Sequence, residues 1–357
     1  MGLLRVLLAL SVFMAHAPQS GLTYGLVGFG GINSVEIFFI ISGIYIALIL
    51  DKTYSSKWSF YKNRILRLYP IYYIICGLVL LRAFILPTFS ESLFNFPAKA
   101  IAVGTLANST FFGSDWLMFL QWENNNLHFG NFTFSEIPLP NMLFVPQSWS
   151  IGLEVTFYLL TPLICKAKSR TIFVLGFILL VARVSGLIFG LNSDPWTYRF
   201  FPFELPLFLL GILIYRIHNH KRKSFEISLN KIYPLLFGFY LIFPYFTHKL
   251  GVNRLWQMLI LITLTSIIMV FGQEKSRDKK FGELSYPIYM SHVLILTTYG
   301  GLIDILAKRI PLLKNLNIPL FAIPLTLVIT FVFSFLLLYL VKPVEKIRAQ
   351  NKSRIQT

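Results

Sequence analysis

Residues 317–341, NIPLFAIPLTLVITFVFSFLLLYLV, run for 25 positions without a charged side chain. A helix that crosses the hydrocarbon core of a bilayer needs about 20 apolar residues, so this stretch predicts a membrane-spanning helix. Similar apolar runs recur along the rest of the chain. Together they predict ten spans, at about 3–17, 32–50, 68–86, 148–165, 171–190, 200–216, 232–247, 255–272, 284–303 and 317–341.

The overall composition agrees with an all-α, polytopic membrane protein. Of the 357 residues, 55% are hydrophobic and only 13% are charged. These values exclude disordered, coiled-coil, collagenous and disulfide-rich classes. The loops are short, so we expect one membrane domain over 1–341. The aromatic and polar segment 87–147 is expected to form a cap outside the membrane, and the basic tail 342–357 is expected to be disordered.

The net charge of +17 is an orientation signal. Most of the 32 Lys and Arg residues fall on one side of the predicted spans, and the positive-inside rule then places both termini in the cytoplasm. Acidic lipid head groups are the expected partners of these loops, and nucleic-acid binding is not needed to explain the charge.

The first span has two interpretations. MGLLRVLLALSVFMAHA offers a basic residue, an apolar run and the small-residue ending Ala15-His16-Ala17, as a cleaved secretory signal does. It also reads as an uncleaved spanning helix. Cys76 and Cys165 lie in different spans, so we expect neither a disulfide nor a metal site.

Two basic groups in the first span lie on one helical face. Arg5 and His16 are eleven residues apart, which is close to three full turns and about 16 Å along the axis. This spacing predicts a cationic anchor at one end of an extended ligand and a base at the other. The alternative is a snorkelling arginine and a histidine satisfied at the outer boundary.

Other polar groups stand where lipid disfavours them. Glu36 lies near the outer end of the second span, and Ser42-Gly43 in its middle favours close helix packing. Arg64 and Arg67 are three residues apart on a short interfacial helix that is expected to end before Pro70. Two such guanidinium groups can chelate a phosphate, or alternatively contact anionic lipid.

Two further spans each carry a polar stripe. The stripe of the fourth span consists of Ser150, Glu154 and Tyr158. The stripe of the ninth span consists of Ser285, Tyr289 and His292. Because a carboxylate in a span must be paired or protonated, Arg183 in the fifth span is the predicted partner of Glu154. No P-loop, G-x-S-x-G or H-E-x-x-H motif occurs.

Taken in order, these segments resemble the acyltransferase-3 family of integral membrane acyltransferases, in its stand-alone form. Arg5, ten intervening residues and His16 resemble its first-helix motif, SVEIFFIISGIYI resembles its second, and Arg64-Ile-Leu-Arg67 resembles its Arg-x-x-Arg. WSIGLEVTFYLLTP and LSYPIYMSH complete the set. Glu36 stands where aspartate is commoner. Gly152, Val155 and Thr156 replace residues that are often Ser, Glu and Gln.

The resemblance implies a multi-pass protein of the bacterial cytoplasmic membrane with an uncleaved first helix. It implies transfer of an acyl group, most often acetyl, from cytoplasmic acyl-CoA to a hydroxyl of a lipid-linked or surface glycan, with no permanently bound cofactor. His16 would be the base, or the site of a covalent acyl intermediate. Arg64 and Arg67 would hold CoA phosphates and Arg5 the pantetheine end or the oxyanion, while Glu36, Glu154 and His292 would orient these groups.

Two other function classes stay open on sequence. The same intramembrane charges could line the pathway of a transporter or flippase for a lipid-linked glycan. A purely structural scaffold is the third option. Consumption of acyl-CoA would separate an enzyme from both.

Overall fold

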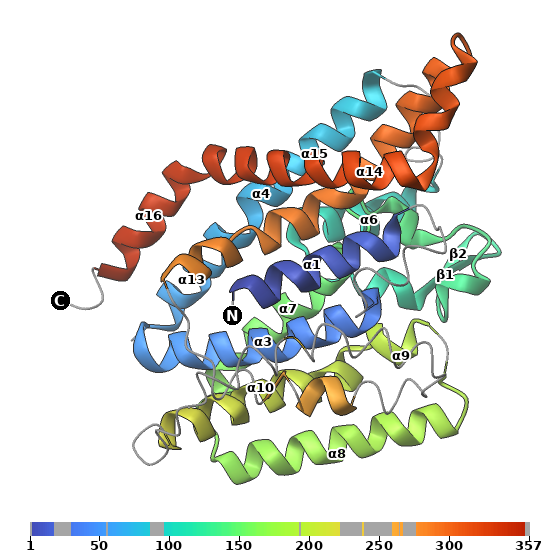
Figure 1. Cartoon of the computed structure of the whole chain (residues 1–357). Helices are drawn as coiled ribbons and strands as arrows, with labels where there is room; N and C mark the ends of the chain where they lie inside the picture. The colour runs from blue at the N-terminus through green and yellow to red at the C-terminus, as the bar shows by residue number, and fades with distance from the viewer. Residues whose placement is uncertain are drawn as a thin grey trace. The chain divides into compact units, whose positions relative to one another are not determined.

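The computed structural model describes residues 2–17, 30–54, 56–85, 96–192, 194–221, 238, 259–263, 265–266 and 276–353. Its secondary structure is helical apart from one two-stranded hairpin (Figure 1). Within these residues, six helices are long and apolar enough to cross a membrane. They are α3 (Gly31–Lys52), α4 (Lys57–Ile85), α8 (Ser169–Ile188), α10 (Phe201–Lys221), α14 (Ser285–Ala307) and α15 (Pro319–Leu340).

Two shorter apolar helices, α1 (Gly2–His16) and α7 (Ser148–Ile164), account for two more of the predicted spans. The predicted span 232–247, and most of the one at 255–272, lie outside the described residues. Several helices also present apolar side chains outward. On α8, Phe173 and Phe177 are 61% and 59% exposed, an arrangement that suits lipid and not water. The chain is therefore an integral, multi-pass membrane protein.

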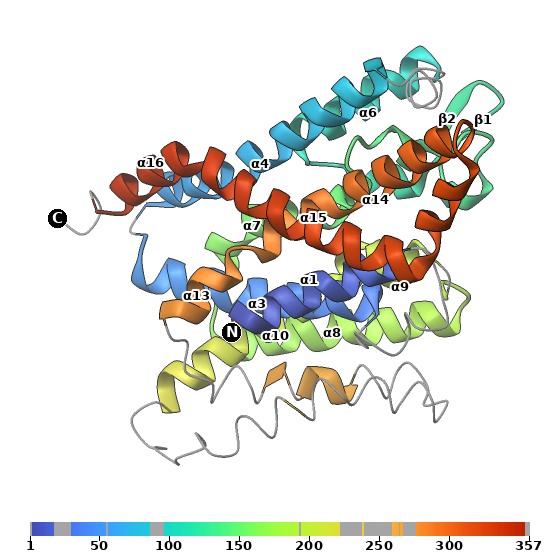
Figure 2. The same cartoon turned by 45° about the horizontal axis from the view of Figure 1, so that its top comes forward.

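The helices group into two compact units. In the first unit, residues 1–38 and 214–342, α1 packs along α14 and along the short helix α13 (Ser276–Gly282) (Figure 2). The Asp278 carboxylate accepts hydrogen bonds of 2.8 Å from the backbone N–H groups of both Gly2 and Leu3. These first-turn groups have no partner within their own helix, so Asp278 fixes the start of α1. The 3₁₀ turn η5 (Pro311–Asn317) joins α14 to α15.

The second unit, residues 39–213 and 343–357, contains α3 from Phe39 onward and α10 up to Leu213, and these two parts are in close contact. A Cβ on Gly43 would lie 2.2 Å from the Phe208 carbonyl oxygen, and one on Gly211 would lie 2.2 Å from that of Ile40. The predicted role of Gly43 in close packing is confirmed. Rings of Phe39 and Phe157 stack on Phe208 beside this crossing, at centroid distances of 4.7 and 4.2 Å.

The described part of the segment 87–147 is folded. It comprises α6 (Ala98–Thr110), η2 (Trp116–Phe119), β1 (Leu120–Glu123), β2 (Asn126–Phe129), η3 (Phe132–Phe134) and η4 (Leu139–Met142). Asn108 ties α6 to η4, because its amide donates to the Met142 carbonyl at 2.8 Å and its Oδ1 accepts from Phe144 N–H at 2.9 Å. The hairpin is a small exception to the all-α prediction. Its turn is Asn124-Asn125, both at positive φ, and such a pair between apolar residues is a hairpin signal.

Two expectations about helix ends are wrong. The helix expected to stop before Pro70 continues through it, since α4 runs from Lys57 to Ile85. Proline is tolerated within membrane helices, where neighbouring groups can satisfy the freed carbonyl. The tail expected to be disordered begins with a helix, α16 (Lys342–Ser353). The Arg348 side chain of this helix is only 11% exposed and interacts with Arg67 of α4, so contacts with the rest of the second unit accompany its ordering.

Candidate functional site

The polar faces of α1 and α14 meet in the first unit. Arg5 Nη2 donates to Ser285 Oγ at 3.1 Å, and Ser285 Oγ donates to the Gly282 carbonyl at 2.8 Å. At the other end of α1, the rings of His16 and His292 lie 5.0 Å apart between centroids. The prediction that Arg5 and His16 share one face is confirmed. The polar stripe of the ninth predicted span is what that face contacts.

Each histidine of the pair hydrogen-bonds a carbonyl of its own helix. His16 Nδ1 lies 2.9 Å from the Val12 carbonyl oxygen, and His292 Nδ1 lies 2.7 Å from that of Tyr289. A carbonyl oxygen can only accept, so Nδ1 carries the proton in each neutral ring and Nε2 keeps its lone pair. His292 Nε2 is buried without a hydrogen-bond partner. Two imidazole lone pairs are therefore available at the end of α1.

The surroundings of this histidine pair are apolar. Phe13, Met14 and Ala17 form a buried cluster that packs against Leu296, Ile323 and Leu327. One turn beyond His292 lies a cavity of about 260 Å³, lined by Leu296, Tyr299, Gly300, Asn317, Ala322 and Thr326. His292 is fully buried whereas His16 is exposed. A base that reacts with a bound substrate needs this combination of a dry wall and an accessible side.

Glu36 is fully buried on α3. The start of that helix packs on the end of α1, where a Cβ on Gly31 would lie 3.1 Å from Ala15 Cβ. Gly31 lies five residues before Glu36, and Ala15 directly precedes His16. The contact between Gly31 and Ala15 therefore brings the start of α3, which carries Glu36, to the end of α1 that carries His16.

Glu154 belongs to the second unit. Its Oε1 accepts from Ser42 Oγ and its Oε2 accepts from Tyr158 Oη at 3.0 Å. The predicted pairing of Glu154 with Arg183 is wrong. Arg183 instead lies 3.3 Å from Glu204 Oε1, in the first turn of α10, and donates to the Phe203 carbonyl at 3.0 Å. Glu204 is fully buried in an apolar run, and that position was the signal that could have identified it as the partner.

Arg64 lies on the other side of Tyr158. Its guanidinium carbon is 6.0 Å from the Tyr158 ring centroid and 5.8 Å from that of Phe60. The residue is only 5% exposed, and Nε has no hydrogen-bond partner. Arg67, one turn further along α4, is half-buried. Tyr158 thus stands between a carboxylate and a buried arginine.

Comparison with known proteins decides the family. The profile of the acyltransferase 3 family, described as an acyltransferase domain, matches residues 1–339. The chain belongs to the acyltransferase 3 family. It is 27% identical over 209 residues to an uncharacterized protein of Aquifex aeolicus (strain VF5), which covers 57% of this chain and 89% of that one.

The acyltransferase is also 24% identical over 326 residues, 82% of its length, to proteins of Staphylococcus aureus strains COL and N315, each named "Putative O-acetyltransferase". It spans half the length of these S. aureus relatives. No solved structure matches it.

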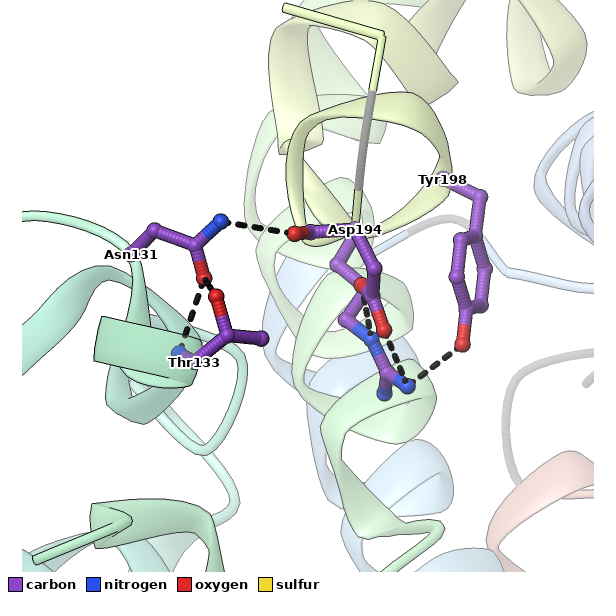
Figure 3. A network of polar contacts seen from close by, with 5 residues as sticks. Asn131, Thr133, Asp194 and Tyr198 are labelled. Atoms are coloured by element: carbon purple, nitrogen blue, oxygen red, sulfur yellow. Dashed lines mark hydrogen bonds and ion pairs between the residues drawn. The ribbon is translucent and has the colours of Figure 1, made fainter. Parts of the chain in front are cut away.

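A polar network fastens the 87–147 segment of the acyltransferase to the loop before α9 (Trp196–Arg199) (Figure 3). Asn131 Nδ2 donates to the Asp194 carbonyl at 2.8 Å, while its Oδ1 accepts from the N–H and hydroxyl of Thr133. The Asp194 carboxylate pairs with Arg199 at 2.7 and 3.1 Å. The Arg199 guanidinium in turn lies 4.3 Å from the Trp149 ring centroid, at the start of α7. This network could not be predicted from the sequence, because its members are far apart in the chain.

Asp115 is a buried carboxyl group outside the membrane-spanning helices, 1% exposed, and Oδ1 has no hydrogen-bond partner. Burial raises the pKa of Asp115 to about 7. It packs against α7, since a Cβ on Gly152 would lie 2.7 Å from Asp115 Oδ1 and 2.5 Å from Ser114 Oγ. Glycine at position 152, where the family often has a larger residue, leaves room for this carboxyl group.

Proposed function

We propose that this acyltransferase moves an acyl group, most often acetyl in the family, from cytoplasmic acyl-CoA to a hydroxyl of a lipid-linked or surface glycan, with His16 as the base. It would cross the cytoplasmic membrane ten times with both termini in the cytoplasm, as the distribution of Lys and Arg predicts. The segment 87–147 would then lie outside, where the acceptor arrives.

The hydrogen bond from His16 Nδ1 to the Val12 carbonyl carries this proposal. It leaves the Nε2 lone pair of an exposed residue to accept a proton, which is what a general base requires. A sugar hydroxyl is a poor nucleophile at neutral pH, and an imidazole nitrogen with a lone pair can take its proton.

The reaction is a single acyl transfer in this scheme. The sugar oxygen attacks the thioester carbonyl carbon while His16 Nε2 takes the hydroxyl proton. The new C–O bond forms, the C–S bond breaks, and the proton passes to the CoA sulfur. His292, held by Tyr289 and 5.0 Å from His16 between ring centroids, would orient this step through its own Nε2.

The remaining roles follow from charge and anchoring. Arg5 is held by Ser285 at the opposite end of α1 from His16, so it can present a fixed cation to a part of the donor remote from the reacting carbonyl, such as the pantetheine end, but not to the oxyanion beside His16. Arg64 and Arg67 would bind donor phosphates. Glu36 and Glu154 would position neighbouring groups, and Glu154 already accepts from Ser42 and Tyr158.

Transfer of labelled acetyl from acetyl-CoA to the lipid-linked glycan fraction tests the proposal. Membranes would contain the native chain, His16→Ala, or the control His218→Ala, which removes a half-buried histidine from α10. We expect label with the native and control proteins, and a loss of 100-fold or more with His16→Ala at equal protein level. Labelling that survives in His16→Ala overturns its role as base. Glycan movement without acyl-CoA consumption would indicate a transporter.

A further inference from the structure

The C-terminal helix brings a third arginine to Arg64 and Arg67. Arg348 lies on α16, and all three residues belong to the second unit. Arg64 and Arg348 lie close enough for their charges to repel each other, and Arg67 acts on both. Figure 2 draws α16 alongside the first half of α4. Three guanidinium groups from two distant parts of the chain are therefore gathered in one place.

Several hydrogen-bond donors in this arginine cluster are buried and unused. Arg64 is 5% exposed, and the Arg348 side chain is 11% exposed. Neither Nε atom has a hydrogen-bond partner. The Tyr54 hydroxyl, two residues beyond the end of α3, is also buried without one, and Tyr54 interacts electrostatically with both arginines. Buried polar groups in folded proteins nearly always have partners, so this concentration of open donors indicates a ligand.

The charge of the arginine cluster is unbalanced. Glu345 pairs with Arg348, but the groups that act most strongly on Arg64 are two arginines and two tyrosines. Burial lowers the pKa of Arg348 and Arg67 lowers it further, whereas Glu345 raises it. An arginine keeps its charge at neutral pH in spite of this. A buried, uncompensated charge destabilises the folded state, and a bound anion would offset that cost.

We propose that Tyr54, Arg64, Arg67 and Arg348 form one phosphate-binding site, with α16 as its closing element. Guanidinium groups bind phosphate oxygens in pairs, and a tyrosine hydroxyl adds a neutral donor. The phosphate belongs either to the nucleotide end of an acyl donor or to an anionic lipid head group. Binding of an acyl donor rests on the proposed function and adds Arg348 and Tyr54 to the residues that hold the donor. Binding of an anionic lipid does not depend on the proposed function.

Binding measurements on the full chain in lipid nanodiscs test this site without any acyl acceptor. In phosphatidylcholine nanodiscs the probe is coenzyme A. We expect Arg348→Ala to weaken its binding about tenfold, Arg348→Lys to weaken it less, and the control Lys346→Ala, an exposed charge on the same helix, to change it less than twofold.

The second arm separates the two sources of phosphate. In nanodiscs of equal phosphatidylglycerol and phosphatidylcholine, native mass spectrometry counts the phosphatidylglycerol that stays bound. If Arg348→Ala loses the bound phosphatidylglycerol, Lys346→Ala keeps it, and coenzyme A binding is unchanged in both, the site is assigned to a lipid. If Arg348→Ala changes neither coenzyme A binding nor the amount of bound phosphatidylglycerol more than Lys346→Ala does, the proposal is overturned. If Arg348→Ala does not fold, Arg348→Lys carries the same test, because it keeps the charge and loses the paired donors.

Failure of this inference and failure of the proposed function are distinguishable. Absence of acyl transfer by the native chain would reject the function and leave the binding results intact. Normal transfer combined with unchanged binding by Arg348→Ala would reject the site alone.

Discussion

The histidine pair of the first unit and the arginine cluster of the second unit both place polar groups in apolar surroundings, but they satisfy them differently. Each histidine donates from Nδ1 to a carbonyl one turn earlier in its own helix. The arginines carry full charge and leave buried donors open. A neutral group with a local partner is inexpensive to bury and keeps a lone pair for proton transfer, whereas a buried charge requires a counter-ion.

This difference predicts opposite kinetic effects, and the largest is at the histidines. His292→Gln removes the buried Nε2 lone pair, and we expect turnover to fall about 100-fold while coenzyme A affinity is unchanged. Steady-state rates with acetyl-CoA, beside a binding titration, measure the two effects separately, with His218→Ala as the control. A fall in affinity with normal turnover would contradict the division between the two regions.

A smaller effect of the opposite kind is expected at Arg64. Arg64→Lys keeps the charge but loses the planar pair of donors, so donor affinity should fall about tenfold while turnover at saturating donor stays the same. Lys62→Ala, an exposed charge on the same helix, is the matched control and should change neither value. A lower turnover of Arg64→Lys at saturating donor would contradict the assignment of donor binding to the arginine cluster.

The smallest effect is expected at Asp115, which belongs to neither pattern because its carboxyl can become neutral by binding a proton. Its pKa is about 7 in the folded chain and near 3.8 when exposed, so the folded state binds the proton more tightly. The contribution of Asp115 to the free energy of unfolding is therefore largest below pH 3.8, and it falls as the pH rises to about 7. Between pH 6 and pH 8 the loss should be about 1 kcal/mol.

Asp115→Asn should abolish this pH-dependent part. Thermal unfolding in detergent at pH 6 and pH 8 measures it, and the difference between the two midpoints should shrink in the variant. An equal shift in the native chain and in Asp115→Asn would show that other groups cause it.

Much of this arrangement could be predicted from sequence, because it depends on local periodicity. Among the described residues, apolar runs identified the six helices long enough to cross a membrane and the two shorter apolar helices, and helical spacing placed Arg5 and His16 on one face. The predictions that were wrong concern residues whose structure depends on tertiary partners. Arg183 selects Glu204 and not Glu154, and α16 is ordered although its composition is that of a disordered tail. Neither result can be read from spacing, because each depends on groups that only folding brings together.

The anchoring of α1 by Asp278 bears on the order of events during synthesis. The first helix of the chain is made at the start, but the carboxylate that holds its first turn is 276 residues away from Gly2. At typical rates of translation this delay is on the order of 10 to 50 s. During that interval α1 has neither Asp278 nor His292 to pack against. The histidine pair can therefore assemble only after residue 292 has been synthesised.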